Sequence, residues 1–249
     1  MTAVPTAQPD PTVPPAGSPV VSPVVSVAFC PCPPLLLPAV EGRAAGETDA
    51  LRAACARAVA ALLACGPEVV VVTGAGAGDD ARFGPGDSGD LRGIGVDLVV
   101  PFAGPARAGG AGVPLAYAVG AWLLDEAGYS GERVGIAPGA LATTLAELSR
   151  PVGVLAMGDG SARRTLKAPG YLDAAAGPFD AAVSGALARG DAAALAALDP
   201  AEGERLLAAG VETWRAVGAA LTARPVTATL HYDDAPFGVG YLVADWWIA

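Results

Sequence analysis

The stretch Val152–Tyr171, which reads VGVLAMGDGSARRTLKAPGY, decides the fold of this chain. Its first part, Val152–Met157, is apolar without a polar alternation, which is typical of a strand buried on both faces. The strand ends at Gly158-Asp159-Gly160, and a polar, basic loop follows. Ligands of open α/β sheets bind outside the carboxyl ends of the strands. We therefore expect a functional site at Met157–Arg164.

Predicted strands and helices alternate along the rest of the chain. Further strand-like runs lie at Val24–Cys30, Glu68–Thr73, Val96–Val100 and Arg133–Ala137. Helices are predicted over Thr48–Cys65, Pro114–Ala127, Leu141–Leu148 and Gly177–Ala223. The last range is interrupted, and Asp191 and Asp199 are expected to cap the helices that they precede. Val226–Tyr232 and Gly238–Trp246 predict a hairpin.

This order predicts a single α/β domain over residues 24–249, with a central mixed β-sheet flanked by helices and a closing β-hairpin at the C-terminus. Residues 1–23 are rich in Pro and Ala and are expected to form a disordered tail. The glycine-rich stretch Gly74–Gly95 is expected to be a loop.

Composition restricts the classes of function. A net charge of −10 argues against nucleic acid and against an anionic membrane surface as partners, because both require clustered Lys and Arg. The apolar run Pro19–Val40 contains too many prolines for a spanning helix, and no cationic segment of a signal peptide precedes it. We expect an acidic, cytoplasmic protein. Its 4 cysteines among 249 residues do not indicate a disulfide scaffold.

Two regions carry candidate chemistry at strand ends. Cys32 follows the first strand in a rigid Pro-rich turn, so Cys30-Pro-Cys32 is either half of a soft-metal site or two small residues at a strand end. His231 is the only histidine, and it precedes the acidic pair Asp233-Asp234. Cys32 and His231 are thus candidate catalytic residues, and Cys32, Asp233 and Asp234 are candidate metal ligands. A packed imidazole and an ordinary acidic turn are the alternatives.

The loop after Val152–Met157 supplies candidate ligand-binding residues, which are Asp159, Ser161, Arg163 and Arg164. Arginine forks suit a bound carboxylate or phosphate, although the pair could equally form a solvated face or an ion pair with Asp159. Ser161 lacks the glycine spacing of a nucleophile elbow. Gly74-Ala-Gly76-Ala-Gly78 does not match a dinucleotide fingerprint, because Asp79 stands where its third glycine would fall.

A set of stretches together resembles a known family. The set comprises Cys30–Pro38, the strand that ends at Thr73, Gly158–Arg163 with Pro169–Tyr171 and Phe179-Asp180, and Ala235–Ala244. In order and spacing they resemble the class III extradiol ring-cleavage dioxygenase superfamily of LigB-like proteins, which includes the Memo-like group, and within it an actinobacterial branch of uncharacterised proteins. The resemblance covers residues 24–249.

For catalytic members, the resemblance implies Fe(II) held by two histidines and one carboxylate, with catechol and O₂ at the open positions and a further histidine as acid/base. At the matching positions this chain has Cys32 and the segment Gly74-Ala75 for the ligand histidines, and Ala162 for the acid/base. Only the carboxylate keeps a counterpart, at Asp233 or Asp234. A single histidine cannot supply two ligands, so the fold is expected without the reaction.

The leading interpretation is therefore a pseudoenzyme with a degenerate metal site and no cofactor, which binds a small molecule or a protein partner. The alternative is an oxidoreductase or hydrolase-like enzyme that uses Cys32, His231 and an aspartate as a different metal site or as a nucleophile with its base. A homo-oligomer is also open. Trp246-Trp247-Ile248 would be either an exposed apolar patch or part of the sheet packing.

Overall fold

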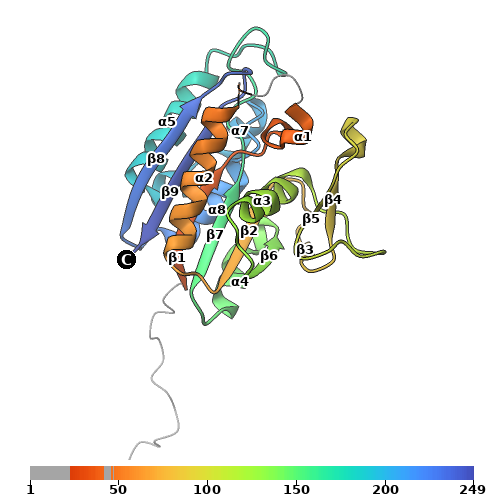
Figure 1. Cartoon of the computed structure of the whole chain (residues 1–249). Helices are drawn as coiled ribbons and strands as arrows, with labels where there is room; N and C mark the ends of the chain where they lie inside the picture. The colour runs from red at the N-terminus through yellow and green to blue at the C-terminus, as the bar shows by residue number, and fades with distance from the viewer. Residues whose placement is uncertain (1–22, 42–45, 47) are drawn as a thin grey trace, which may run out of the picture.

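The computed structural model describes residues 23–41, 46 and 48–249 (Figure 1). Its main strands are β1 (Val24–Cys30), β2 (Val69–Gly74), β3 (Arg82–Phe83), β6 (Glu132–Ile136), β7 (Val152–Met157), β8 (Val226–Asp234) and β9 (Tyr241–Ile248). They form a 7-stranded mixed sheet in the order β3-β6-β2-β7-β1-β9-β8. The predicted mixed α/β architecture with a closing hairpin is confirmed. Of the expected tail, residues 1–22 lie outside the described residues.

The centre of the sheet is parallel. β7 pairs in parallel with both β1 and β2, and Met157 lies level with Cys30 on one side and Gly74 on the other. Every residue of β2 and β7 is buried, which agrees with the continuous apolar runs of these strands. Because the three strands end level, the segments that follow them emerge at one edge of the sheet. We call this the carboxyl edge.

The hairpin β8/β9 extends the sheet beyond β1. β9 pairs antiparallel with β1 and with β8, so β8 runs in the same direction as β1 and ends at the carboxyl edge. Trp246 is buried, its ring centroid lies 4.8 Å from that of Phe29, and its Nε1 donates to the Leu187 carbonyl oxygen at 2.8 Å. Trp247 points to the other face and is 52% exposed. The C-terminal segment therefore packs on the sheet through alternate residues.

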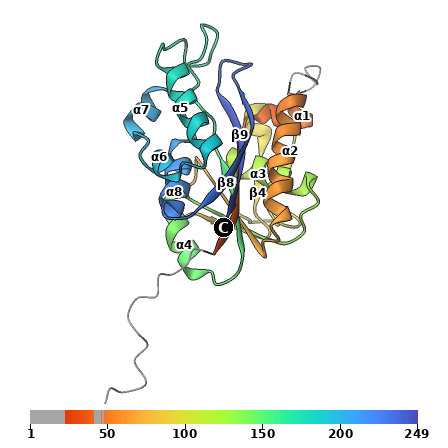
Figure 2. The same ribbon diagram turned by 90° about the vertical axis from the view of Figure 1, so that its left-hand side faces the viewer.

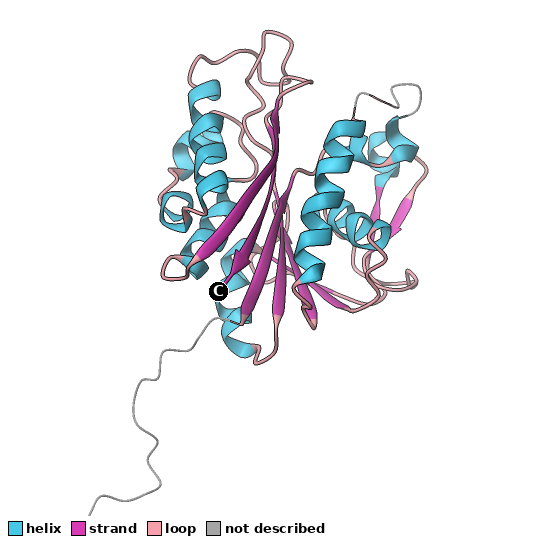
Figure 3. Ribbon diagram, turned by 60° about the vertical axis from the view of Figure 1, so that its left-hand side comes forward, coloured by secondary structure: helices cyan, strands magenta, loops and turns pink. Residues whose placement is uncertain are grey.

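Helices cover both faces of the sheet, as Figures 2 and 3 show. One core cluster joins the sheet to α2 (Asp49–Ala64) and α3 (Leu115–Glu126). The other joins it to α4 (Leu141–Glu147), α5 (Ala176–Arg189), α6 (Ala192–Ala196) and α8 (Val211–Leu221). The caps predicted for α6 and for α7 (Pro200–Arg205) are confirmed, because Asp191 and Asp199 accept from backbone N–H groups at 2.9 Å. A short α1 (Pro38–Glu41) follows the Pro-rich turn.

Two expectations about the glycine-rich region were wrong in detail. Within Gly74–Gly95 the chain forms β3, which pairs antiparallel with Gly135 and Ile136 of β6, because Phe83 is buried against the sheet edge. The same region contains β4 (Ser88–Asp90), which pairs with β5 (Val99–Pro101) in a separate 2-stranded sheet. The strand expected at Val96–Val100 is thus shorter and lies outside the main sheet. Within the described ranges, no helix is long and apolar enough to cross a membrane.

Candidate functional site

The exits of β1 and β7 are joined directly at the carboxyl edge. The Gly158 N–H donates to the Cys30 carbonyl oxygen at 2.9 Å, immediately before the chain turns away from the sheet. A Cβ atom on Gly158 would lie 2.4 Å from the Cα of Gly210, which precedes α8. Only glycine allows this close approach of two backbones. The approach fixes where Asp159 stands.

Cys32 and Asp159 form one hydrogen-bonded unit. The Cys32 backbone N–H donates to Asp159 Oδ1 at 2.7 Å, so a residue of the Pro-rich turn is tied to the loop after β7. Both residues are half-buried. Burial raises the pKa of the Asp159 carboxyl to about 6, although the hydrogen bonds from Cys32 oppose the rise. Burial, and then the neighbouring Asp159 charge, raise the pKa of the Cys32 thiol well above its usual value.

The other cysteine of the Cys-Pro-Cys motif lies deeper in the core. Cys30 is buried on β1, where its thiol contacts that of Cys55 on α2. The hydrogen bond with Cys55, followed by burial, raises the pKa of the Cys30 thiol. Thiols held in the protonated form are poor metal ligands and poor nucleophiles. Cys30 therefore behaves as a small core residue.

The basic loop is held by a buried carboxylate that the sequence-based prediction did not include among the site residues. Asp180 on α5 is fully buried, accepts from the Ser161 N–H at 2.8 Å, and pairs with Arg164 at 2.8 Å. Burial raises the pKa of the Asp180 carboxyl, and these two hydrogen bonds counteract the rise. An ion pair with Asp159 was one of the alternatives for the arginines, and it was wrong for Arg164, whose partner is Asp180.

Of the predicted ligand-binding residues, most use their polar groups internally. Ser161 is buried, and its hydroxyl donates to the Leu206 carbonyl oxygen at 2.7 Å. Asp159 is engaged by Cys32, and Arg164 by Asp180. Arg163 differs, because its Nε is buried and has no hydrogen-bond partner among the described residues. The loop is thus internally braced, apart from the buried Nε of Arg163.

The three candidates on the hairpin point to different partners. Asp233 accepts a hydrogen bond from the Ser184 hydroxyl of α5 at 2.6 Å, and Asp234 accepts from the Ala235 N–H in the turn at 2.7 Å. His231 Nε2 lies 2.5 Å from Asp245 Oδ1 on β9. Cys32, for its part, is bound to Asp159. The structure therefore gives Cys32 and His231 separate carboxylates and does not pair them with each other.

The residues at this edge do not fit the iron site that the resemblance implies for catalytic relatives. The resemblance assigns the first ligand position to Cys32, whose thiol pKa is raised by burial, and the Asp233 carboxylate is bound to Ser184. Among residues 23–41, 46 and 48–249, no group of three or more His, Cys, Asp or Glu side chains is arranged to hold a metal ion. A set with two imidazoles cannot be built from one histidine.

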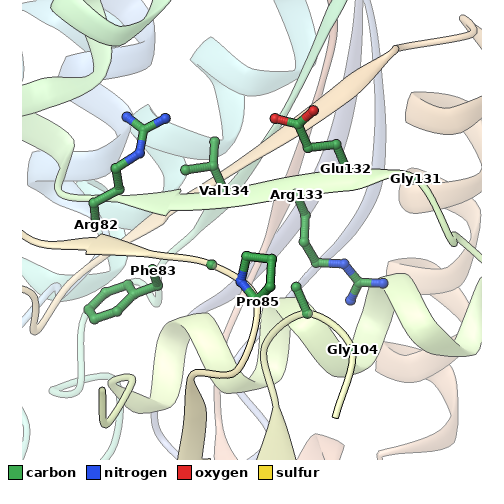
Figure 4. Close-up of a pocket in the computed structure, with 10 residues that line it drawn as sticks. Arg82, Phe83, Pro85, Gly104, Gly131, Glu132, Arg133 and Val134 are labelled. Atoms are coloured by element: carbon green, nitrogen blue, oxygen red, sulfur yellow. The ribbon is translucent and has the colours of Figure 1, made fainter. Parts of the chain in front are cut away.

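Two open cavities lie on the β3/β6 side of the sheet, away from the hairpin. One of about 570 Å³ is lined by β3, β6 and the segment 103–104. In Figure 4, Arg82 and Glu132 project to one side of β6, and Arg133 to the other. Glu132 and Arg133 are already paired, with Arg150 and Asp125 at 2.7 Å in each case. The other, of about 600 Å³, lies between the segment 79–82 and α4. Both are lined by residues from separate segments, so no local motif indicated them.

Neither a scan against models of known protein families nor a search of curated proteins finds a match for this chain. The resemblance described above therefore rests on the residues of the chain itself.

Proposed function

We propose that this chain is a class III extradiol dioxygenase-like protein whose non-haem iron site has been dismantled. In this proposal, the protein binds a small molecule or a protein partner at the carboxyl edge instead of cleaving aromatic rings. The observation that carries the proposal is the unit formed by Cys32 and Asp159. By the resemblance, Cys32 corresponds to the first ligand histidine. Its backbone N–H donates to Asp159, and burial raises the pKa of its thiol, which favours the neutral form over the thiolate that a metal needs.

The chemistry of this unit suggests which small molecules it would bind. Asp159 offers a half-buried carboxylate that accepts hydrogen bonds, and Tyr241 lies close enough for Asp159 to help raise the pKa of its phenol, after burial. Among the described residues no cation pairs with Asp159, so its charge would repel an anionic ligand, whereas a neutral hydroxylated molecule could donate a hydrogen bond to it. We therefore assign a neutral ligand with hydroxyl groups to this position.

The same observations weigh against the enzyme alternative. A Cys nucleophile needs a lowered thiol pKa and an adjacent base. Here the thiol pKa of Cys32 is raised, and the imidazole of His231 is bound to Asp245.

Catechol is a suitable probe, because it is a neutral diol and the substrate that the resemblance implies for catalytic relatives. We expect saturable heat in a calorimetric titration of the wild-type protein with catechol, and loss of that heat in Cys32→Phe, whose ring would fill the position. Oxygen uptake with catechol and Fe(II) should equal that of the protein-free mixture. Protein-dependent oxygen uptake that Cys32→Ser abolishes would overturn the proposal, and absence of saturable heat would remove its small-molecule part.

A further inference from the structure

Two loops near the carboxyl edge pack on each other. They are residues 161–173, between β7 and α5, and residues 206–210, between α7 and α8, and we call them the paired loops. The Ala162 N–H donates to the Leu207 carbonyl oxygen at 3.3 Å, and Ser161 and Ala208 form an isolated antiparallel bridge. The two loops therefore lie against each other, beside α5 and α7 (Figure 2).

This surface exposes large apolar side chains. Most of the exposed large hydrophobic residues in the described part of the chain are here: Leu166 (77%), Tyr171 (76%), Leu172 (51%) and Leu207 (45%). An apolar group of this size on a protein surface is typical of a contact surface.

The backbone is strained where it presents two of these side chains. Tyr171 has φ 58° and Leu207 has φ 54°, and they are the non-glycine residues with positive φ among those described. A left-handed conformation is unfavourable for such bulky residues, and hydrogen bonds from Gly170 and Tyr171 to Ala162 and Ala168 hold the turn. Strain of this kind persists where the surrounding structure imposes it, and it is concentrated at functional surfaces.

The paired loops carry a basic tip, and a hollow with acidic residues at its rim lies next to them. Residues 161–173 carry three basic residues, Arg163, Arg164 and Lys167, the only lysine of the chain, and one acidic residue, Asp173. Arg164 and Asp173 are already paired, with Asp180 and Arg205. Beside them, a hollow of about 600 Å³ lies between α7 and the start of α8. Alanines 201, 208 and 209 line it, together with Glu204 and Glu212. Among the described residues, neither Lys167 nor Glu204 has an ion-pair partner, and both Leu166 and Lys167 are exposed.

We propose that two copies of this chain associate about a twofold axis through the paired loops. The apolar and basic tip, Leu166-Lys167, of each copy enters the acidic-rimmed hollow of the other, and Lys167 of one copy meets Glu204 of the second. A twofold interface is formed by the same patch on both copies, so an exposed tip and a fitting hollow on one patch suffice. This interface involves the paired loops and the adjoining hollow alone and does not depend on the small-molecule proposal.

The test is the mass of the full chain in solution, measured by sedimentation equilibrium over a wide range of concentration. We expect a dimer, at least tenfold weaker dimerisation in Lys167→Glu and in Glu204→Lys, and recovery in the double variant, where the charges are exchanged. Leu172→Ser should weaken the dimer similarly. Ile94→Ser is the matched control, because Ile94 is 54% exposed and lies in another region.

Each contrary result overturns the inference. A wild-type protein that stays monomeric at every concentration excludes the interface, and assemblies that grow beyond a dimer exclude its twofold form. A double variant that stays as weak as the single ones removes the pairing of Lys167 with Glu204. A control that dissociates the dimer as much as Leu172→Ser would place the interface elsewhere. Circular dichroism of each variant separates dissociation from unfolding.

Discussion

Replacing Asp159 by Asn should change how the stability of the protein depends on pH. The Asp159 carboxyl has a pKa of about 6 in the folded protein, against 3.8 for an unperturbed aspartate. Between about pH 4 and pH 6, the folded state therefore holds a proton that the unfolded state has released. The free energy of unfolding therefore falls as the pH rises through this window. The contribution of Asp159 is fully lost above the pKa that its carboxyl has in the folded protein. Asn has no carboxyl group to ionise, and its oxygen can still accept from the Cys32 N–H.

The size of the effect follows from the shift. A rise from 3.8 to about 6 corresponds to about 3 kcal/mol at about 1.4 kcal/mol per pKa unit. Because the side chain is half-buried and partly screened by solvent, we expect roughly 1–3 kcal/mol. Urea denaturation of both proteins at about pH 4 and about pH 8 measures it. The difference in free energy of unfolding between Asp159→Asn and the wild type should shift in favour of the variant by this amount between the lower and the higher pH.

Asp90→Asn is the control for this experiment. Asp90 is exposed, and its hydrogen bonds with Arg92 lower its pKa to about 2. Its contribution is lost only as the pH falls from the unfolded pKa toward about 2, so the variant should show no added slope above about pH 4. Parallel curves for wild type and Asp159→Asn would refute the burial of the Asp159 charge, and with it the role assigned to Cys32.

Three further predictions concern the same edge of the sheet. Iodoacetamide, followed by peptide mapping, should label Cys32 more slowly than a free cysteine at neutral pH, because the raised pKa leaves little thiolate; faster labelling would favour the enzyme alternative. Asp180→Ala should lower the free energy of unfolding by about 3 kcal/mol, since it leaves the Ser161 N–H and Arg164 unpaired, and an unchanged urea midpoint would contradict this. Gly158→Ala should destabilise the protein, because its Cβ would lie 2.4 Å from a backbone atom of Gly210. The control is Gly177→Ala on α5, where the Cβ meets open space, and it should be neutral or stabilising in the same urea titration.

Local patterns predicted the elements of this fold well where burial and propensity agree. Val152–Met157 forms the strand its apolar run predicts, and Asp191 and Asp199 cap the helices they precede, because a cap needs only neighbouring backbone. β3 was missed because a two-residue strand has no periodicity and exists only through its pairing with β6. Tertiary pairing, not local sequence, decides such a strand.

The site shows the same division. Cys32 and Asp159 could be expected at the carboxyl edge from the sequence, because both follow parallel strands. No local pattern indicated that Cys32 and Asp159 form a hydrogen bond. The ion pair of Arg164 with Asp180 was not indicated either, because Asp180 lies on α5 and meets the loop only in the folded protein. The signal available was weak but present: Phe179-Asp180 belongs to the set of stretches that resembles the family, and an acidic residue beside Phe on an apolar helix face requires a partner. The cavities and the paired loops depend on contacts between distant segments.

The measurement that tests the central claim most directly is the metal content of the purified protein after anaerobic reconstitution with Fe(II) and, separately, Zn(II). Mass spectrometry of the wild type and Cys32→Ser supplies it, with Cys65→Ser as a control for loss of any thiol. We predict no stoichiometric metal in any of the three proteins, because burial raises the pKa of the Cys32 thiol and the Asp233 carboxylate is bound to Ser184. About one metal ion per chain in the wild type and in Cys65→Ser, lost in Cys32→Ser, would contradict the dismantled site.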